Sequence, residues 1–151
     1  DLRESFHNHF ITEESIGILS LAQSTVFDDF PNLKIIMGHG GGSIPYQVGR
    51  WRARLRGKNG EETFDQHLKH LYYDTCLYNS ESLELLFKIV GPDRCLFGTE
   101  RPGAGSAQNP RTGDWYDDTK PLIDGIDFLS SEDRSAIFEG NARGVYQKRY
   151  Q

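Results

Sequence analysis

Short apolar runs alternate with segments of helical periodicity along this chain, and this alternation constrains the fold more than any other feature. The runs cover residues 33–37, 71–77 and 94–98. The first is a continuous apolar strand, which is typical of a parallel sheet covered on both faces. Strands that alternate with helices indicate βα units. The sequence therefore predicts an α/β fold built on a parallel sheet.

Helical periodicity and capping signals divide the rest of the chain. Thr12 is the expected N-cap of the first helix, with Glu13 and Glu14 in its first turn, where carboxylates favour the positive end of the dipole. Ser130 and Asp133 resemble the capping box of the last helix. We expect the ordered pattern to end over 141–146. The predicted helices span residues 12–30, 43–56, 61–70, 80–90, 117–127 and 130–139.

Composition excludes several classes of function. The chain has 151 residues, with 17 Lys and Arg against 22 Asp and Glu, and a net charge of −5 argues against nucleic-acid binding. No apolar run approaches the roughly 20 residues that a membrane span needs. Cys76 and Cys95 lie in strand-like runs and are expected to be buried thiols rather than a nucleophile or a disulfide. We therefore expect a cytoplasmic protein that binds neither nucleic acid nor membrane.

Functional side chains of a parallel α/β fold lie where strands end, which directs attention to His39, residues 74–79 and residues 99–101. Three glycines follow His39, and they permit a sharp turn with room for a ligand near the next helix. Histidine also suits acid–base chemistry near neutral pH. The alternative is a glycine turn with an incidental histidine.

Carboxylates end the other two strands. Glu100 can bind a metal or accept a proton, and the alternative is a surface salt bridge with Arg101. Asp74 can orient a site histidine or cap the helix that follows it.

Other histidines and one arginine are weaker candidates. His7 and His9 would point to the same side of a strand and suit a metal, whereas a frayed terminus would leave them exposed. His67 and His70 are expected on a solvated helix face rather than as a ligand pair. Arg50 belongs to a cationic run and could bind a substrate carboxylate through its planar fork.

Several short motifs spread over nearly the whole chain are weak singly and specific together. They are DFPNLK at 29–34, GHGGG at 38–42 with PY at 45–46 and Arg50, YDTC at 73–76, GPDRCLFG at 91–98, PRTG at 110–113, YDDTK at 116–120 and IFEGNAR at 137–143. Together they resemble the amidohydrolase-2 branch of the metal-dependent (β/α)8 hydrolases, and most of all its 4-oxalomesaconate hydratase group. The branch also includes aromatic-acid decarboxylases.

The resemblance implies a role for each candidate. His39 would handle protons or position a metal-bound water, and Glu100 would take the place of the branch's metal-binding aspartate. Arg50 would bind a substrate carboxylate, and Asp74 would act at the site or orient a residue of it. His9 would fall just after the fifth strand of the barrel and contact the substrate.

The sequence also departs from the family pattern. Members open with a His-x-His pair on the first strand and add a metal histidine from the fifth, and this chain starts after both. His7 and His9 would then not be that first-strand pair, and Asn79 stands where the hydratase group is expected to have a histidine. We therefore expect residues 1–151 to form a partial domain, about strands six to eight of a (β/α)8 TIM barrel.

The resemblance implies a metal-dependent enzyme that hydrates or decarboxylates a small carboxylated ring-cleavage or aromatic-acid substrate. The cofactor would be a divalent metal, with Zn²⁺ as the expected ion. The alternatives are hydrolysis of an amide or lactone, or a non-catalytic partial subunit that lacks a complete metal site. Because three strands cannot close a barrel, activity is expected to need a complementing N-terminal half, or a homo-oligomer.

Overall fold

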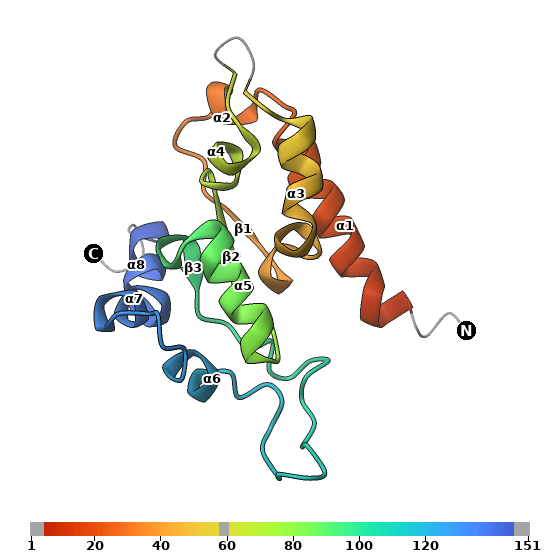
Figure 1. The fold of residues 1–151 in the computed structure, drawn as a ribbon, viewed down its shortest axis with the longest axis vertical. Helices are drawn as coiled ribbons and strands as arrows, with labels where there is room; N and C mark the ends of the chain where they lie inside the picture. Colours follow the sequence, from red (N-terminus) through yellow and green to blue (C-terminus); the bar gives the residue numbers. More distant parts are fainter. Residues whose placement is uncertain (1–4, 58–60, 147–151) are drawn as a thin grey trace.

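Three parallel strands lie at the centre of the computed structural model, which describes residues 5–57 and 61–146. Figure 1 shows α1 and α3 on one side of them, and α6, α7 and α8 on the other. In chain order the elements are α1 (Ser5–Leu21), α2 (Val26–Asp29), β1 (Ile35–Met37), η2 (His39–Gly41), α3 (Ile44–Arg54), α4 (Phe64–Leu68), β2 (Leu71–Asp74), α5 (Ser80–Val90), η4 (Pro92–Arg94), β3 (Cys95–Leu96), α6 (Lys120–Asp124), α7 (Ser131–Ser135), the π-helical turn η5 (Ala136–Gly140) and α8 (Asn141–Val145).

The strands follow the order β1-β2-β3 and all pairs are parallel. Ile35 aligns with Leu71, and Tyr73 aligns with Cys95. Helices α3 and α4 connect the first pair and α5 connects the second, as parallel strands require crossover connections. The predicted α/β fold with a parallel sheet is therefore confirmed for the described residues.

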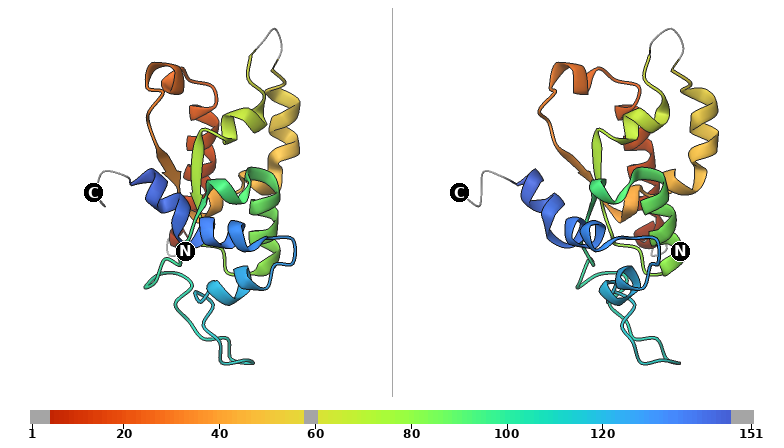
Figure 2. Two further views of the ribbon diagram at one scale, coloured as in Figure 1. Left: turned by 90° about the vertical axis from the view of Figure 1, so that its left-hand side faces the viewer. Right: turned by 60° about the vertical axis from the view of Figure 1, so that its left-hand side comes forward.

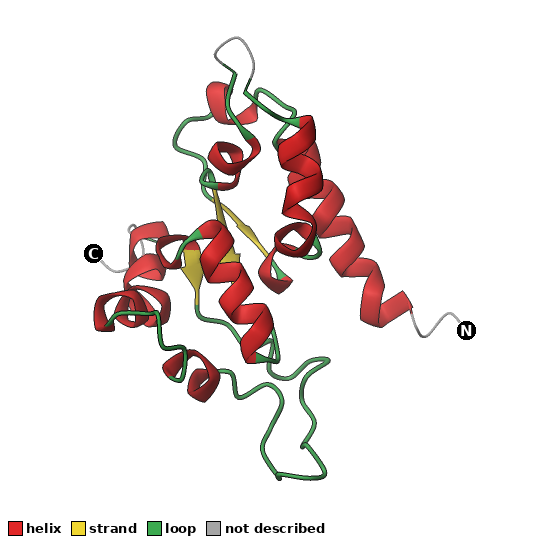
Figure 3. Cartoon of the chain, in the orientation of Figure 1, coloured by secondary structure: helices red, strands yellow, loops and turns green. Residues whose placement is uncertain are grey.

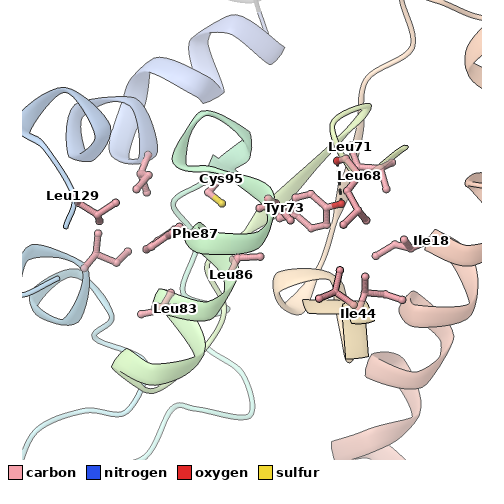
Figure 4. Close-up of a cluster of buried hydrophobic side chains, with 14 of the residues drawn as sticks. Ile18, Ile44, Leu68, Leu71, Tyr73, Leu83, Leu86, Phe87, Cys95 and Leu129 are labelled. Atoms are coloured by element: carbon pink, nitrogen blue, oxygen red, sulfur yellow. Dashed lines mark hydrogen bonds between the residues drawn. The ribbon is translucent and has the colours of Figure 1, made fainter. Parts of the chain in front are cut away.

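The hydrophobic core lies between the sheet and its helices. Leu71 and Tyr73 of β2 are buried, whereas Tyr72 and Asp74, which point to the opposite face, are half-buried. The Tyr73 hydroxyl donates a hydrogen bond to the carbonyl of Leu68 at 3.1 Å, so its polar end is satisfied inside the core (Figure 4). Helix α5 contributes side chains at helical spacing to the same cluster: Leu83, Leu86, Phe87 and Val90. Strand β1, expected to be covered on both faces, is only half-buried in this chain.

The first helix differs from the prediction, and the difference affects the site. Helix α1 begins at Ser5, and Thr12 lies inside it, where its hydroxyl donates to the carbonyl of Asn8 at 3.1 Å. A threonine that can cap a helix can also donate a hydrogen bond to a carbonyl of the preceding turn. The prediction that the helix starts at Thr12 is therefore wrong. His7 and His9 therefore lie on a helix and not on a strand, and Glu14 lies in the helix body.

The C-terminal helices are more continuous than predicted. The capping box of Ser130 and Asp133 is confirmed, and it starts α7. The chain then continues through η5 and α8 to Val145, over residues where an end of the pattern was expected. Between β3 and α6 lies a long irregular segment, which Figure 3 draws as loop and Figure 2 shows extending beyond the carboxyl ends of the strands.

One expectation from composition agrees with the structure. Cys76 and Cys95 are free and buried, and desolvation raises the pKa of both thiols, which keeps them protonated. Across the described residues, no helix combines the length and apolar character that crossing a membrane demands.

Candidate active site at the carboxyl ends of the strands

His39, Asp74 and Glu100 come together where the three strands end. His39 Nε2 lies 3.6 Å from Glu100 Oε2. Asp74 Oδ1 accepts hydrogen bonds from the backbone N–H of Gly40 at 3.0 Å and of Cys76 at 3.1 Å. The aspartate therefore anchors the turn that carries His39, and three residues predicted from separate strands form one cluster.

Two members of the cluster have unusual backbone conformations. His39 has a φ of 44° and Glu100 a φ of 55°, both in the left-handed region that residues other than glycine rarely adopt. Each such residue costs about 1–3 kcal/mol and persists where the surrounding structure holds it, which is common at functional sites. Gly40 is also left-handed, and a Cβ there would lie 2.7 Å from Leu77 Cδ1. The glycines therefore let the turn fit under Leu77.

Glu14 of α1 holds the His39 ring. His39 Nδ1 lies 2.8 Å from Glu14 Oε1, so the nitrogen donates to the carboxylate and Nε2 is directed toward Glu100. Burial lowers the pKa of His39, but the hydrogen bond and charge of Glu14, with the charges of Glu100 and Asp74, outweigh it and raise the pKa above 6.5. His39 is therefore protonated more readily than a free histidine.

Tyr78 holds the carboxylate of Glu100. Its hydroxyl donates a hydrogen bond to Glu100 Oε2 at 2.5 Å. Desolvation raises the pKa of Tyr78, and so do the hydrogen bond to Glu100 and the charge of that carboxylate. The phenol therefore remains a donor, and it fixes the orientation of the candidate metal ligand.

Buried polar contacts position the loops behind the cluster. The Thr75 hydroxyl bonds both the N–H and the carbonyl of Gly98, each at 3.0 Å, and so ties the end of β2 to the end of β3. Asp117 is buried and pairs with Arg101 at 3.2 Å. Arg101 is therefore bound to Asp117, and the alternative of a salt bridge to Glu100 is not what the structure shows.

A cavity of about 690 Å³ opens at this cluster. That volume is in the range of pockets for small organic ligands. Polar groups in its wall include His39, Glu100 and Tyr78, together with His7 from α1. Apolar atoms come from residues such as Phe10, Ile11, Leu77 and Pro102. The cavity can hold a small polar molecule against one imidazole, one carboxylate and one phenol.

The two residues predicted to bind the substrate lie outside this cavity. Arg50 is exposed on α3. His9 lies on α1, where its Nε2 is 3.0 Å from Glu13 Oε1, and both side chains are more than half exposed. His7, two residues earlier on the same helix, does line the cavity. The substrate-binding roles of Arg50 and His9 stay predictions.

Glu14 and Tyr78 are site residues that sequence reasoning missed. Tyr78 falls within residues 74–79, which the strand-end rule had selected, but no motif distinguished it from its neighbours. Glu14 was assigned to the first turn of a helix. The signal that finds it is the helical spacing Ile11, Glu14, Ser15 and Ile18, which places it on the same face as core residue Ile18.

The sequence matches the family described as Amidohydrolase over residues 5–148. The chain belongs to the amidohydrolase family. It is 38% identical over 141 residues to 2-keto-4-carboxy-3-hexenedioate hydratase of Sphingobium sp. (strain NBRC 103272 / SYK-6), covering 93% of this chain and 41% of the relative. It is 28% identical over 146 residues to gamma-resorcylate decarboxylase of Polaromonas sp. (strain JS666 / ATCC BAA-500), covering 91% and 41%.

A solved amidohydrolase structure shares the fold. 4-Oxalomesaconate hydratase, LigJ, from Rhodopseudomonas palustris superposes with a TM-score of 0.85 and 36% identity, covering 93% of this chain and 43% of that chain. This chain therefore spans about two fifths of the length of the relatives named here. The family is metal-dependent, and its members related to this chain include hydratases and decarboxylases.

The donors at the strand ends fit part of a divalent-metal site. Glu100 offers a carboxylate oxygen held by Tyr78, and His39 offers Nε2 at 3.6 Å from it. Asp74 is less available, because its Oδ1 accepts two backbone hydrogen bonds. Within the described residues, then, one carboxylate and one imidazole at this site suit a metal.

Proposed function

We propose that this chain supplies strands six to eight of a (β/α)8 metal-dependent enzyme that acts on a small carboxylated ring-cleavage or aromatic-acid substrate. The observation that carries the proposal is the contact between His39 Nε2 and Glu100 Oε2 at the carboxyl ends of parallel strands, beside a cavity of about 690 Å³. Active sites of (β/α)8 enzymes lie at that end of the barrel.

Glu100 is the metal ligand that this chain contributes, and Zn²⁺ is the ion proposed. When bound, such an ion supplies a positive charge that polarises a substrate oxygen or a water. Further ligands would come from residues outside the described cluster. Tyr78 donates to Glu100 and keeps its carboxylate oriented, as partners of metal ligands commonly do.

His39 is the residue that moves a proton. Glu14 fixes Nδ1 as a donor, so the proton exchanged with the substrate is carried on Nε2. This nitrogen lies near Glu100, and both residues line the cavity. For hydration of a C=C bond, His39 would deliver that proton to one substrate carbon as the hydroxyl of a water adds to the other, and the remaining proton of the water would restore His39. For decarboxylation, the same proton would replace the lost carboxyl group.

Hydration is the favoured reaction of the two. The relative with 38% identity and the structure with 36% identity are both hydratases, whereas the decarboxylase reported above is 28% identical. Arg50 and His9 are proposed to bind a substrate carboxylate, Arg50 through its guanidinium fork. Homo-oligomers, or a complementing N-terminal half, would complete the site.

The test is a pair of assays on the purified protein combined with its complementing N-terminal half and loaded with zinc. We expect hydration of 2-keto-4-carboxy-3-hexenedioate, followed by loss of its conjugated absorbance, and little release of CO₂ from gamma-resorcylate. His39→Asn should lower the hydration rate by about 10²- to 10⁴-fold. If the metal-loaded protein consumes neither substrate, the result would instead support the second candidate, a non-catalytic partial subunit. The incomplete set of metal ligands among the described residues of this site favours that candidate.

A further inference from the structure

A second cluster of metal-binding side chains lies at the opposite end of the sheet from His39. Glu62 Oε2 is 2.8 Å from His70 Nε2 and 3.3 Å from His67 Nδ1. The ligand atoms of all three residues lie within 4.8 Å of one another, and this is the one such group among residues 5–57 and 61–146. His67 lies on α4 and His70 immediately precedes β2, near the end of the molecule where Figure 1 shows α2 and α4.

We propose that Glu62, His67 and His70 form a second divalent-metal site, which binds zinc or a similar transition-metal ion. Two imidazole nitrogens and one carboxylate oxygen are a donor set that zinc takes when it keeps a fourth position for water. Two ligands of a tetrahedral zinc, each about 2.0–2.1 Å from the ion, are roughly 3.3 Å apart. The distance from Glu62 Oε2 to His67 Nδ1 already has this value. The distance from Glu62 Oε2 to His70 Nε2 would have to increase by about 0.5 Å.

Both histidines are held in place before any ion binds. The His70 ring stacks on Phe27, with ring centroids 4.9 Å apart and planes 15° apart. His67 is only 20% exposed, and the short helix that carries it starts with a capping box between Thr63 and Gln66. The sequence had suggested a solvated face for these two histidines. Instead both histidines contact the carboxylate of Glu62. Because their rings are already held in place, metal binding would have to order them little further.

The segment that carries Glu62 is also fixed to its surroundings. Arg56 and Thr63 form an antiparallel bridge on either side of the turn. Gly57 has a φ of +65°, and a Cβ there would lie 2.5 Å from the carbonyl oxygen of Glu61. The conformation of Gly57 therefore favours glycine, and the bridge holds Thr63, the neighbour of Glu62, against Arg56.

A cavity of about 740 Å³ adjoins the cluster and provides room for water on the metal. Its wall contains Glu62 and His67, and also the carboxylates of Asp28 and Glu61. Arg54 and Arg56 line it too, and Arg54 donates a hydrogen bond to Gln23 at 3.4 Å. Acidic side chains thus balance the two cations.

Without a metal, the same three residues would be an ion-pair cluster in which Glu62 accepts from both rings. The two accounts differ in what zinc does. A metal site predicts that zinc binds with both imidazoles as ligands and raises the melting temperature. An ion-pair cluster predicts no change on adding zinc.

The test compares Glu62→Gln with Glu61→Gln in the purified, chelator-treated protein. Both variants remove one negative charge from the same cavity wall, but only Glu62 contacts the histidines. By titration calorimetry, Glu62→Gln should bind one zinc fewer per chain than Glu61→Gln and should lose the zinc-dependent rise in melting temperature. Equal zinc stoichiometry and equal stabilisation in the two variants would overturn the proposal.

A second measurement needs no variant. In protein labelled with ¹⁵N-histidine, zinc should shift the Nδ1 resonance of His67 and the Nε2 resonance of His70 to values of metal-bound imidazole. Shifts confined to other histidines, such as His39 at the strand ends, would contradict the proposal. Because His39 lies at the other end of the strands, failure of this site leaves the proposed function untouched, and the reverse also holds.

Discussion

His39 Nδ1 lies 2.8 Å from Glu14 Oε1, so two residues that are 25 positions apart form one unit. Glu14 is on α1 and His39 is on the turn after β1. The second oxygen of Glu14, Oε2, is buried and has no hydrogen-bond partner among the described residues. The carboxylate of Glu14 therefore bonds the imidazole alone. The pKa and ring orientation of His39 depend on α1, a helix that carries no residue of the strand-end cluster.

Glu14→Gln tests this dependence. The amide oxygen can still accept from Nδ1, but the negative charge that raises the pKa of His39 is gone, so the pKa should fall. An NMR titration of the His39 ring measures it. Hydration activity should decrease by roughly 10- to 100-fold, as for other partners that orient site residues.

Glu13→Gln is the matched control for that variant. Glu13 is the neighbouring residue, is exposed and pairs with His9 instead. Its substitution should leave the pKa of His39 unchanged. Equal falls of the His39 pKa in both variants would indicate a general charge effect rather than the contact with Glu14.

The raised pKa of His39 also predicts a pH dependence of stability. A histidine whose folded pKa lies above its unfolded value binds more protons in the folded state, so its contribution is complete below pH 6.5, the ordinary value. The contribution is lost as pH rises through the folded pKa. Urea unfolding at pH values from about 5 to 9 should show this loss in the wild type. In His39→Gln the loss should be absent, and a matching decline in that variant would refute the assignment.

Tyr78→Phe removes the hydroxyl that donates to Glu100 Oε2 and leaves the ring in place. The carboxylate then loses the group that orients it, so the affinity for the activating metal should fall roughly 10- to 100-fold. The metal concentration that restores half of the activity to chelator-treated protein measures this affinity. Tyr46→Phe, at a residue that is 79% exposed, is the control and should change nothing.

Gly40→Ala and Gly49→Ala are expected to change stability in opposite directions. At Gly40 a methyl group would meet Leu77 in a left-handed conformation, so the variant should lose about 1–2 kcal/mol of unfolding free energy. Gly49 lies within α3 with no heavy atom within 4 Å of the added Cβ, and alanine there should add about 0.5–1 kcal/mol. Urea denaturation measures both, and a gain of stability in Gly40→Ala would show that the His39 turn is not strained as described.

The sequence predicted the sheet well because strand patterns and strand ends are local properties. The runs at 33–37, 71–77 and 94–98 each contain an observed strand, although β3 is only two residues long. Parallel strands place their carboxyl ends together, which is why the convergence of His39 and Glu100 was predictable before any contact was known.

Contacts that depend on how helices pack were not predictable in this way. Glu14 reaches His39 because α1 packs against the turn after β1, and no local pattern in the sequence contains that packing. Glu62 meets His67 and His70 across the short helix α4, whose capping box at Thr63 directly follows Glu62, and the charge pattern of this segment alone had suggested a solvated face. The register of helices on the sheet decides these pairs.

The central claim is that Glu100 and His39 belong to a metal-dependent active site, and metal-restored activity of Glu100→Gln tests it most directly. Wild-type protein should lose hydration of 2-keto-4-carboxy-3-hexenedioate on chelation and regain it when zinc is added back. Glu84→Gln, at a carboxylate that pairs with Lys88 on the surface of α5, should behave like the wild type. Glu100→Gln should regain less than about a hundredth of the activity under the same conditions, because the metal would lack its carboxylate ligand. Full recovery of activity in Glu100→Gln would contradict the account.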